Sequence, residues 1–146
     1  MSVELVTDYP HEAEITYQAA IVHDNLGLER EAIPFYTQTL EQGLSGSDTA
    51  TKLMKRERAF LGLGSTYRVL GEYQQAEETL RRGLGEFPHS RPLQVFLALA
   101  LYNRQKPKEA MELVLTNLLE TTADETLQYY QRGLLYYALH LDEIAE

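Results

Sequence analysis

The residues most often used in catalysis are few in this chain and lie far apart. There is no cysteine, which excludes a disulfide framework and thiolate chemistry. There is also no HExxH metal motif, no GxxxxGKS/T or GxGxxG phosphate loop and no GxSxG nucleophile motif. The four histidines are widely spaced and form no metal-ligand pattern: His11, His23, His89 and His140.

The acidic residues do not indicate a catalytic pair either. Glu12 and Glu14, and likewise Glu77 and Glu78, fall at positions that we expect to be exposed on helices. No neighbouring group is expected there to raise the pKa of a carboxyl group. We therefore expect a protein that is not an enzyme, with no catalytic, metal-binding or cofactor-binding residues.

Composition and charge narrow the class of partner. The 146 residues carry a net charge of −9, from 13 basic and 22 acidic residues. Nucleic acid is disfavoured, because affinity for phosphate backbones depends on Lys and Arg. We interpret the one basic cluster as a solvated helix face, with a binding patch as the alternative; it comprises Lys52, Lys55, Arg56 and Arg58. No secretory leader and no membrane-spanning run is visible, so we expect a cytoplasmic protein.

The stretch Phe60–Pro88 predicts two antiparallel helices. Its apolar residues recur over 60–70 at steps of three and four, as on one face of a helix. Gly71 follows that stripe, as a left-handed residue at a helix end would, and a second stripe comes after it. Gly64 lies beside the first stripe and Ala76 belongs to the second, which predicts a close contact between the helices at these two small residues.

These residues resemble the tetratricopeptide repeat (TPR), whose pattern is W-x2-L-G-x2-Y…A-x3-F…P. The matching positions are Phe60 in place of Trp, Leu63-Gly64, Tyr67, Ala76, Leu80 in place of the second aromatic, and Pro88. The alternative is an ordinary helical hairpin in a bundle. Repetition favours the TPR, because Ala110 follows Ala76 by one TPR period, which is about 34 residues.

The resemblance implies an all-α, right-handed superhelix of three TPR-like helix pairs plus a C-terminal capping helix, similar to small stand-alone bacterial TPR proteins. We expect a single domain over 1–146. Its expected parts are a leader at 1–10, repeat 1 at 11–44, an insertion and helix extension at 45–56, repeat 2 at 57–90, repeat 3 at 91–123 and the capping helix at 124–146.

Capping residues predict where individual helices begin. Asp48, Ser90 and Asp124 are expected N-caps. The helix after Asp48 is expected to cover 49–70, so that its first turns project from the body with the basic cluster. The last helix is expected to be continuous, and its four tyrosines either pack on the preceding pair or contact another chain.

The resemblance also implies where a partner binds, because the first helices of TPR pairs line a concave side. Residues displaced from the packing stripe share that face. In the first helix these are Glu14, Tyr17, Ile21, Asp24 and Asn25; in the third, Arg58, Leu61, Ser65, Arg68 and Val69; in the fifth, Val95, Leu99, Tyr102 and Asn103. This groove would suit a peptide or protein segment with aliphatic side chains.

Other interpretations stay open. Chaperone-binding TPR proteins place Lys and Asn where this chain has Tyr17 and Ile21, so that ligand class is disfavoured. The groove residues could instead pack along the superhelix. The chain could be a homodimeric scaffold, joined by the long third helix or by Tyr129 and Tyr136 of the last one. It could also be a chaperone for a secreted client, a class that is small, acidic and built on three TPR pairs.

Overall fold

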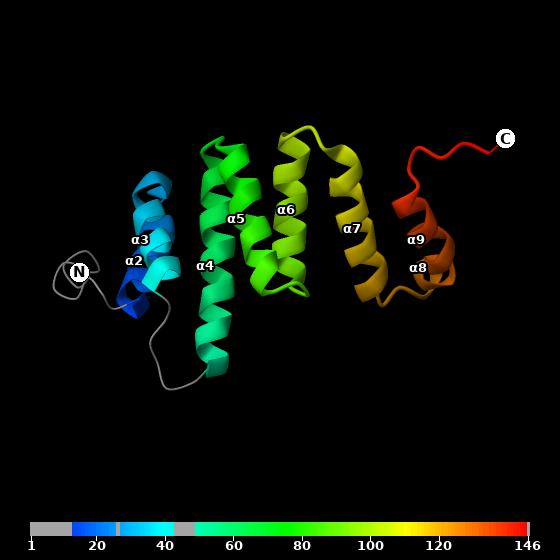
Figure 1. Ribbon diagram of the computed structural model, residues 1–146. Helices are drawn as coiled ribbons and strands as arrows, with labels where there is room; N and C mark the ends of the chain where they lie inside the picture. Colours follow the sequence, from blue (N-terminus) through cyan, green and yellow to red (C-terminus); the bar gives the residue numbers. More distant parts are fainter. Residues whose placement is uncertain (1–12, 26, 43–48, 146) are drawn as a thin grey trace.

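The chain folds into a row of helices. The computed structural model describes residues 13–25, 27–42 and 49–145, and within these ranges every regular element is a helix. The elements are α2 (Ala13–Asn25), α3 (Glu29–Gln42), α4 (Thr49–Val69), α5 (Tyr73–Glu86), α6 (Arg91–Asn103), α7 (Pro107–Thr121), α8 (Glu125–Tyr129) and α9 (Gln131–Leu139). They stand side by side from α2 and α3 at one end to α8 and α9 at the other (Figure 1). The expected all-α array of TPR-like helix pairs is confirmed.

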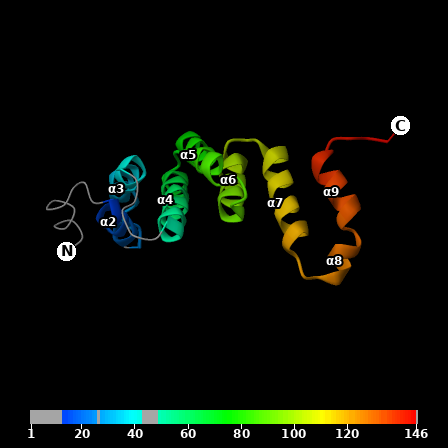
Figure 2. The ribbon, with the colours of Figure 1, turned by 60° about the horizontal axis from the view of Figure 1, so that its bottom comes forward.

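The packing of the array follows the order of the chain. Helix α2 packs on α3, α4 on α5 and α6 on α7, and each pair also contacts the next one. Seen from a second direction, α8 and α9 form the end of the row beyond α7 (Figure 2). Helix α6 touches both helices of the preceding pair, α4 and α5.

Left-handed residues end two of the helices in the same way. Gly71 has φ 78° and follows α4, where the amide of Glu72 donates to the carbonyl of Tyr67 at 2.8 Å. Gln105, one repeat period later, has φ 59° and follows α6. The amide after it donates to the carbonyl of Leu101 at 2.9 Å, which is the same type of bond. The two repeats therefore share the geometry of this turn, although only the first of them has glycine.

Side-chain caps begin two helices as predicted. The hydroxyl of Ser90 accepts a hydrogen bond from the amide of Leu93 at 3.3 Å. The carboxylate of Asp124 accepts from the amides of Thr126 at 2.9 Å and Leu127 at 3.0 Å. These bonds satisfy amides that have no partner inside the helix. The third predicted cap, Asp48, and the leader at 1–10 lie outside the described residues.

Glycines on α4 let its neighbours approach closely. A Cβ atom on Gly62 would lie 2.6 Å from Cζ of Tyr36 in α3, and one on Gly64 would lie 2.5 Å from Cγ of Leu80 in α5. Ala76, the other residue of the predicted close contact, is fully buried. The missing side chain at Gly64 thus makes room both for the buried side chain of Leu80 and for the close approach of α5.

Helix α4 is the longest described helix, with 21 residues. Its first turns extend beyond the ends of the neighbouring helices (Figure 1). The basic cluster on these turns is only partly the solvated face that we expected. The guanidinium of Arg56 donates to Oε1 of Glu86 at 2.6 Å and to the carbonyl of Leu40 at 2.9 Å. Arg56 therefore ties the extension to α3 and α5, while Leu53 and Met54 beside it are exposed.

The C-terminal helix differs from the prediction. It is interrupted at Tyr130 and ends at Leu139, so that α8 and α9 replace one continuous helix. Ala138 of the expected inner stripe is buried, whereas Tyr130 and Tyr137 are exposed. Helix α9 packs on α7. All four tyrosine side chains of α8 and α9 are exposed, so the rings are not buried against the preceding pair as the first of the two expected alternatives required.

Candidate functional site

The binding residues predicted on the third and fifth helices lie on neighbouring helices, since α4 and α6 contact each other. We call this surface the α4–α6 face; its residues are Arg58, Leu61, Ser65 and Arg68 of α4 and Val95, Leu99, Tyr102 and Asn103 of α6. Val95 and Leu99 are exposed, and Tyr102 is 70% exposed. Leu61 is partly buried against the core. The α6 half of the face is thus an apolar strip open to solvent.

Two arginines on α4 border this strip. The Nε of Arg68 donates to Oδ1 of Asn103 at 2.8 Å, which joins α4 to α6 at the edge of the face. Arg58 is exposed ten residues earlier, near the middle of α4. Within the described part of the chain, neither arginine forms an ion pair with a carboxylate. The face therefore offers positive charge in a chain that is acidic overall.

Two hollows adjoin the face. One of about 360 Å³ is lined by Met54, Glu57, Arg58, Leu61 and Pro92. We call the other the α6–α7 hollow; it has a volume of about 410 Å³ and is lined by Val95, Ala98, Leu99, Tyr102, Pro107, Ala110, Met111 and Val114. The resemblance to the TPR named only first helices of pairs, so it missed Met111 and Val114 of α7. The repeat period could have pointed to these two residues, because they occupy the same positions in their repeat as Glu77 and Leu80 do in the preceding one.

Helix α2 contributes less to the site than expected. Tyr17 is buried in the core cluster, which corrects its expected place on an open groove floor. Helix α2 packs on α3 and also reaches α4. Ile21 is partly buried against the same core. The side chains of Asp24 and Asn25 lie outside the described part of the structure.

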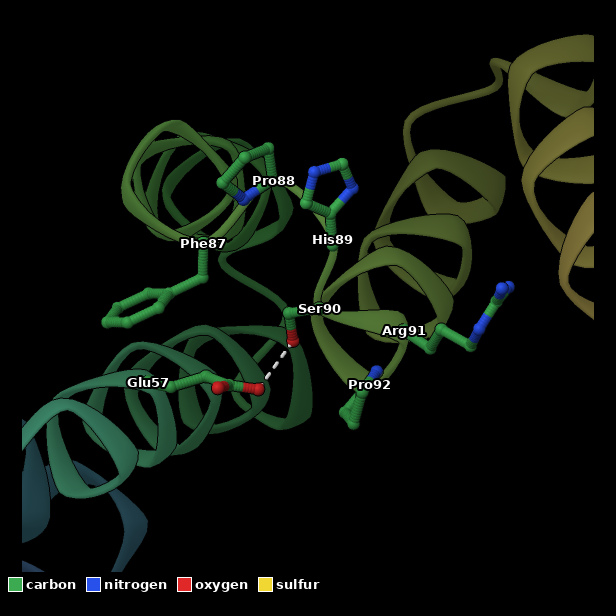
Figure 3. Close-up of a pocket in the computed structure, with 7 residues that line it drawn as sticks. All are labelled: Glu57, Phe87, Pro88, His89, Ser90, Arg91 and Pro92. Atoms are coloured by element: carbon green, nitrogen blue, oxygen red, sulfur yellow. Dashed lines mark hydrogen bonds between the residues drawn. The ribbon is translucent and has the colours of Figure 1, made fainter. Parts of the chain in front are cut away.

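An open pocket of about 600 Å³ lies at the start of α6 (Figure 3); it is lined by Glu57, Phe87, Pro88, His89, Ser90, Arg91 and Pro92. The hydroxyl of Ser90 donates to Oε1 of Glu57 at 2.6 Å while it caps α6. Figure 3 shows His89 on the other side of Ser90 from Glu57. Both bonds of the hydroxyl are structural, and they hold the start of α6 against α4.

Glu77 contradicts the expectation of an exposed acid, because it is only 7% exposed. Its carboxylate accepts from Nε of Arg81 at 2.8 Å, Nε of Arg104 at 3.1 Å and Nζ of Lys106 at 2.9 Å. Burial by itself raises the pKa of this carboxyl, but the hydrogen bonds from the three cations outweigh it and lower the pKa to about 2. Glu77 is therefore a charged anchor between α5 and the α6–α7 turn.

The tyrosines of the last two helices form a second exposed surface. Tyr129, Tyr130, Tyr136 and Tyr137 are all exposed. The rings of Tyr129 and Tyr130 meet edge to face, with centroids 5.0 Å apart. The hydroxyl of Tyr136 donates to Oε1 of Glu143 at 2.7 Å. The two proposed self-association residues, Tyr129 and Tyr136, are thus accessible to another chain.

Comparison with known proteins agrees with the fold. The family model described as tetratrico peptide repeat matches residues 13–141, so the chain belongs to the TPR family. TPR proteins are protein–protein interaction modules and are generally not enzymes. No curated protein matches the chain. Among the described helices, none combines the length and the apolar composition that a bilayer crossing needs.

Proposed function

We propose that this protein binds a peptide or protein segment on its α4–α6 face. The observation that carries the proposal is the open apolar strip of Val95, Leu99 and Tyr102 beside two arginines that lack carboxylate partners in the described structure. The alternative is that these side chains only pack along the array. Leu61 does pack against the core, but the exposed residues of α6 do not.

The chemistry of the face defines what it can bind. Tyrosine and arginine are the residue types that dominate binding energies at protein interfaces, because they combine a large contact area with hydrogen-bond donors. Arg58 and Arg68 are ten residues apart on one helix, which separates them by about 15 Å along its axis. The matching segment has aliphatic side chains for the α6 strip and acidic groups for the arginines of α4.

The test compares capture of partners by the wild-type chain and by the double variant Arg58→Glu with Leu61→Ser. Both positions belong to the α4–α6 face and neither lines the α6–α7 hollow. We expect the variant to lose the partners that the wild type captures, as measured by quantitative mass spectrometry. Undiminished capture would place the binding site elsewhere.

A matched control is available near the other end of the array. Leu28→Ser with Arg30→Glu makes the same two chemical changes at exposed residues. The ion pair of Arg30 with Glu72 at 3.1 Å is at the surface, so its loss should cost little stability. Capture by this control should equal that of the wild type.

The exposed tyrosines favour a second candidate, a homodimeric scaffold. An apolar patch this exposed at the end of a helical row is a typical contact surface. Tyr129→Ser with Tyr136→Ser would then turn a dimer into a monomer in sedimentation equilibrium. A wild-type chain that sediments as a monomer at high concentration would eliminate this candidate.

A further inference from the structure

Helix α7 has an apolar stripe that no other described helix covers. Met111, Val114 and Leu118 follow one another at steps of three and four, so they lie on one face of the helix. Met111 is 49% exposed and Val114 is 44% exposed. With the strip on α6, Met111 and Val114 form the wall of the α6–α7 hollow.

The preceding repeat shows what normally covers this surface. Glu77 and Leu80 of α5, the counterparts of Met111 and Val114 one repeat earlier, are 7% and 0% exposed. Helix α6 packs on both α4 and α5, its buried leucines share the core cluster of Leu80, and Arg104 at its end donates to the carboxylate of Glu77. Its buried stripe is Leu93, Leu97 and Leu101, at four-residue steps. The α6–α7 hollow is the equivalent surface one repeat later.

The last two helices do not take that place. Helix α9 packs on α7, but neither α8 nor α9 makes a comparable contact with α6 in the described structure. The contact involves another side of α7, since Leu119 is buried there and Nε2 of Gln131 donates to its carbonyl at 2.9 Å. The counterpart of Leu119 one repeat earlier is Gly85, which is exposed. The end of the chain thus covers the outer side of α7 and leaves the hollow open.

We propose that the α6–α7 hollow binds one amphipathic helix of a partner protein, in the place that α6 takes on α4 and α5. This surface continues the row of helix–helix interfaces within the chain, which is why a helix fits it. The residues that line it are all uncharged, so the inserted side chains are aliphatic and recur at three- and four-residue steps. Val95 and Tyr102 are seven residues apart, or about 10 Å along the helix, so two to three turns of partner fill the hollow.

The proposal deepens the proposed function and rests on the chain being an interaction module. It is tested separately, because Met111 and Val114 are on α7 and the α4–α6 face does not include them. The probe is a fluorescently labelled synthetic peptide of residues 89–106, the α6 sequence, since that stripe already fits the equivalent surface. Saturable binding to the full chain is measured by fluorescence polarisation.

We expect Met111→Glu with Val114→Glu to weaken peptide binding by at least about tenfold, because two charges would face the inserted aliphatic side chains. Both side chains are nearly half exposed, so the variant should fold, and circular dichroism checks this. If the double glutamate variant does not fold, the milder variant Met111→Ser with Val114→Ser takes its place in the binding assay. The control Val22→Glu with Leu28→Glu changes two similarly exposed apolar residues near the other end and should bind the peptide normally.

Three results would overturn the proposal. The first is absence of saturable binding, or equal binding by the Met111 and Val114 variants. The second is loss of binding only with Arg58→Glu and Leu61→Ser, which would leave the α4–α6 face as the site. The third is a different occupant of the hollow.

The occupant can be identified directly because the chain has no cysteine. Arg68 and Asn103 are hydrogen-bonded to each other. The residues at the same two positions one repeat later are Tyr102 and Tyr137, so these two would come together if the end of the chain packed on α6 as α6 packs on α4. A disulfide formed in the free monomer by Tyr102→Cys with Tyr137→Cys would mean that the chain's own end fills the hollow. A dimer dissolved by Met111→Glu with Val114→Glu would mean that a second copy does. Under the proposal, neither is observed.

Discussion

The charged anchor at Glu77 leads to a quantitative prediction for the variant Glu77→Gln. Glu77 joins α5 to the α6–α7 turn through Arg81, Arg104 and Lys106. The pKa of its carboxyl is lowered from 4.5 to about 2 in the folded chain. At 1.36 kcal/mol per pKa unit, the ionised carboxylate stabilises the fold by about 3 kcal/mol at neutral pH.

The amide of the variant keeps the shape of the side chain but removes its charge. Arg104 and Lys106 remain partly exposed, so water can solvate them and no buried unpaired cation adds to the loss. We therefore expect a loss close to the linkage value, about 3 kcal/mol, which corresponds to a fall in Tm of about 6–12 °C for a chain of this size. Glu78→Gln is the matched control, because Glu78 is the adjacent acid and is exposed.

The dependence on pH provides the assay. A carboxyl with a lowered pKa contributes stability above its unfolded pKa and loses it as the pH falls through its folded pKa. The difference in Tm between wild type and Glu77→Gln should therefore be full at pH 7 and shrink from about pH 4.5 towards pH 2. Thermal unfolding followed by circular dichroism measures this. A difference that is the same at pH 7 and pH 3, or an equal effect of Glu78→Gln, would refute the reasoning.

Three further changes are tested by chemical denaturation. Gln105→Gly should stabilise the chain by about 1 kcal/mol, because it relieves the left-handed conformation at φ 59°; a loss of stability would show that the side chain matters there. Gly64→Ala should cost about 1–3 kcal/mol, since its Cβ would lie 2.5 Å from Cγ of buried Leu80; unchanged stability would disprove the close approach. Ser90→Ala should cost about 1 kcal/mol through the lost cap and the lost bond to Glu57, and a variant as stable as wild type would contradict this.

Much of the fold could be predicted because its signals are local or periodic. The caps Ser90 and Asp124 act on amides two or three residues away. Gly71 ends a helix through bonds within one turn. The repeat period then aligns these ends, so the helix pairs follow without knowledge of their contacts. The same period placed the exposed residues of the α4–α6 face on neighbouring helices.

The candidate site was predicted less completely, because burial depends on residues distant in the chain. Met111 of the α6–α7 hollow was missed, since the resemblance places binding residues only on the first helices of pairs. Whether the α6–α7 hollow is covered depends on where α9 lies, and α9 packs on α7 without a comparable contact with α6. Tyr17 has the helical position of a groove residue, yet it is buried in the core cluster.

By itself, the sequence determined where several helices begin or end, that they repeat, and that the chain is a TPR protein. These properties arise from hydrogen bonds and side-chain spacings within a few turns. The tertiary structure alone decided that Glu77 is a buried, ionised anchor, because its partners Arg104 and Lys106 come from a turn that is distant in the sequence. It also decided that the C-terminal helices cover the outer side of α7. The packing of one helix on another depends on the fit of whole surfaces, which no local pattern contains.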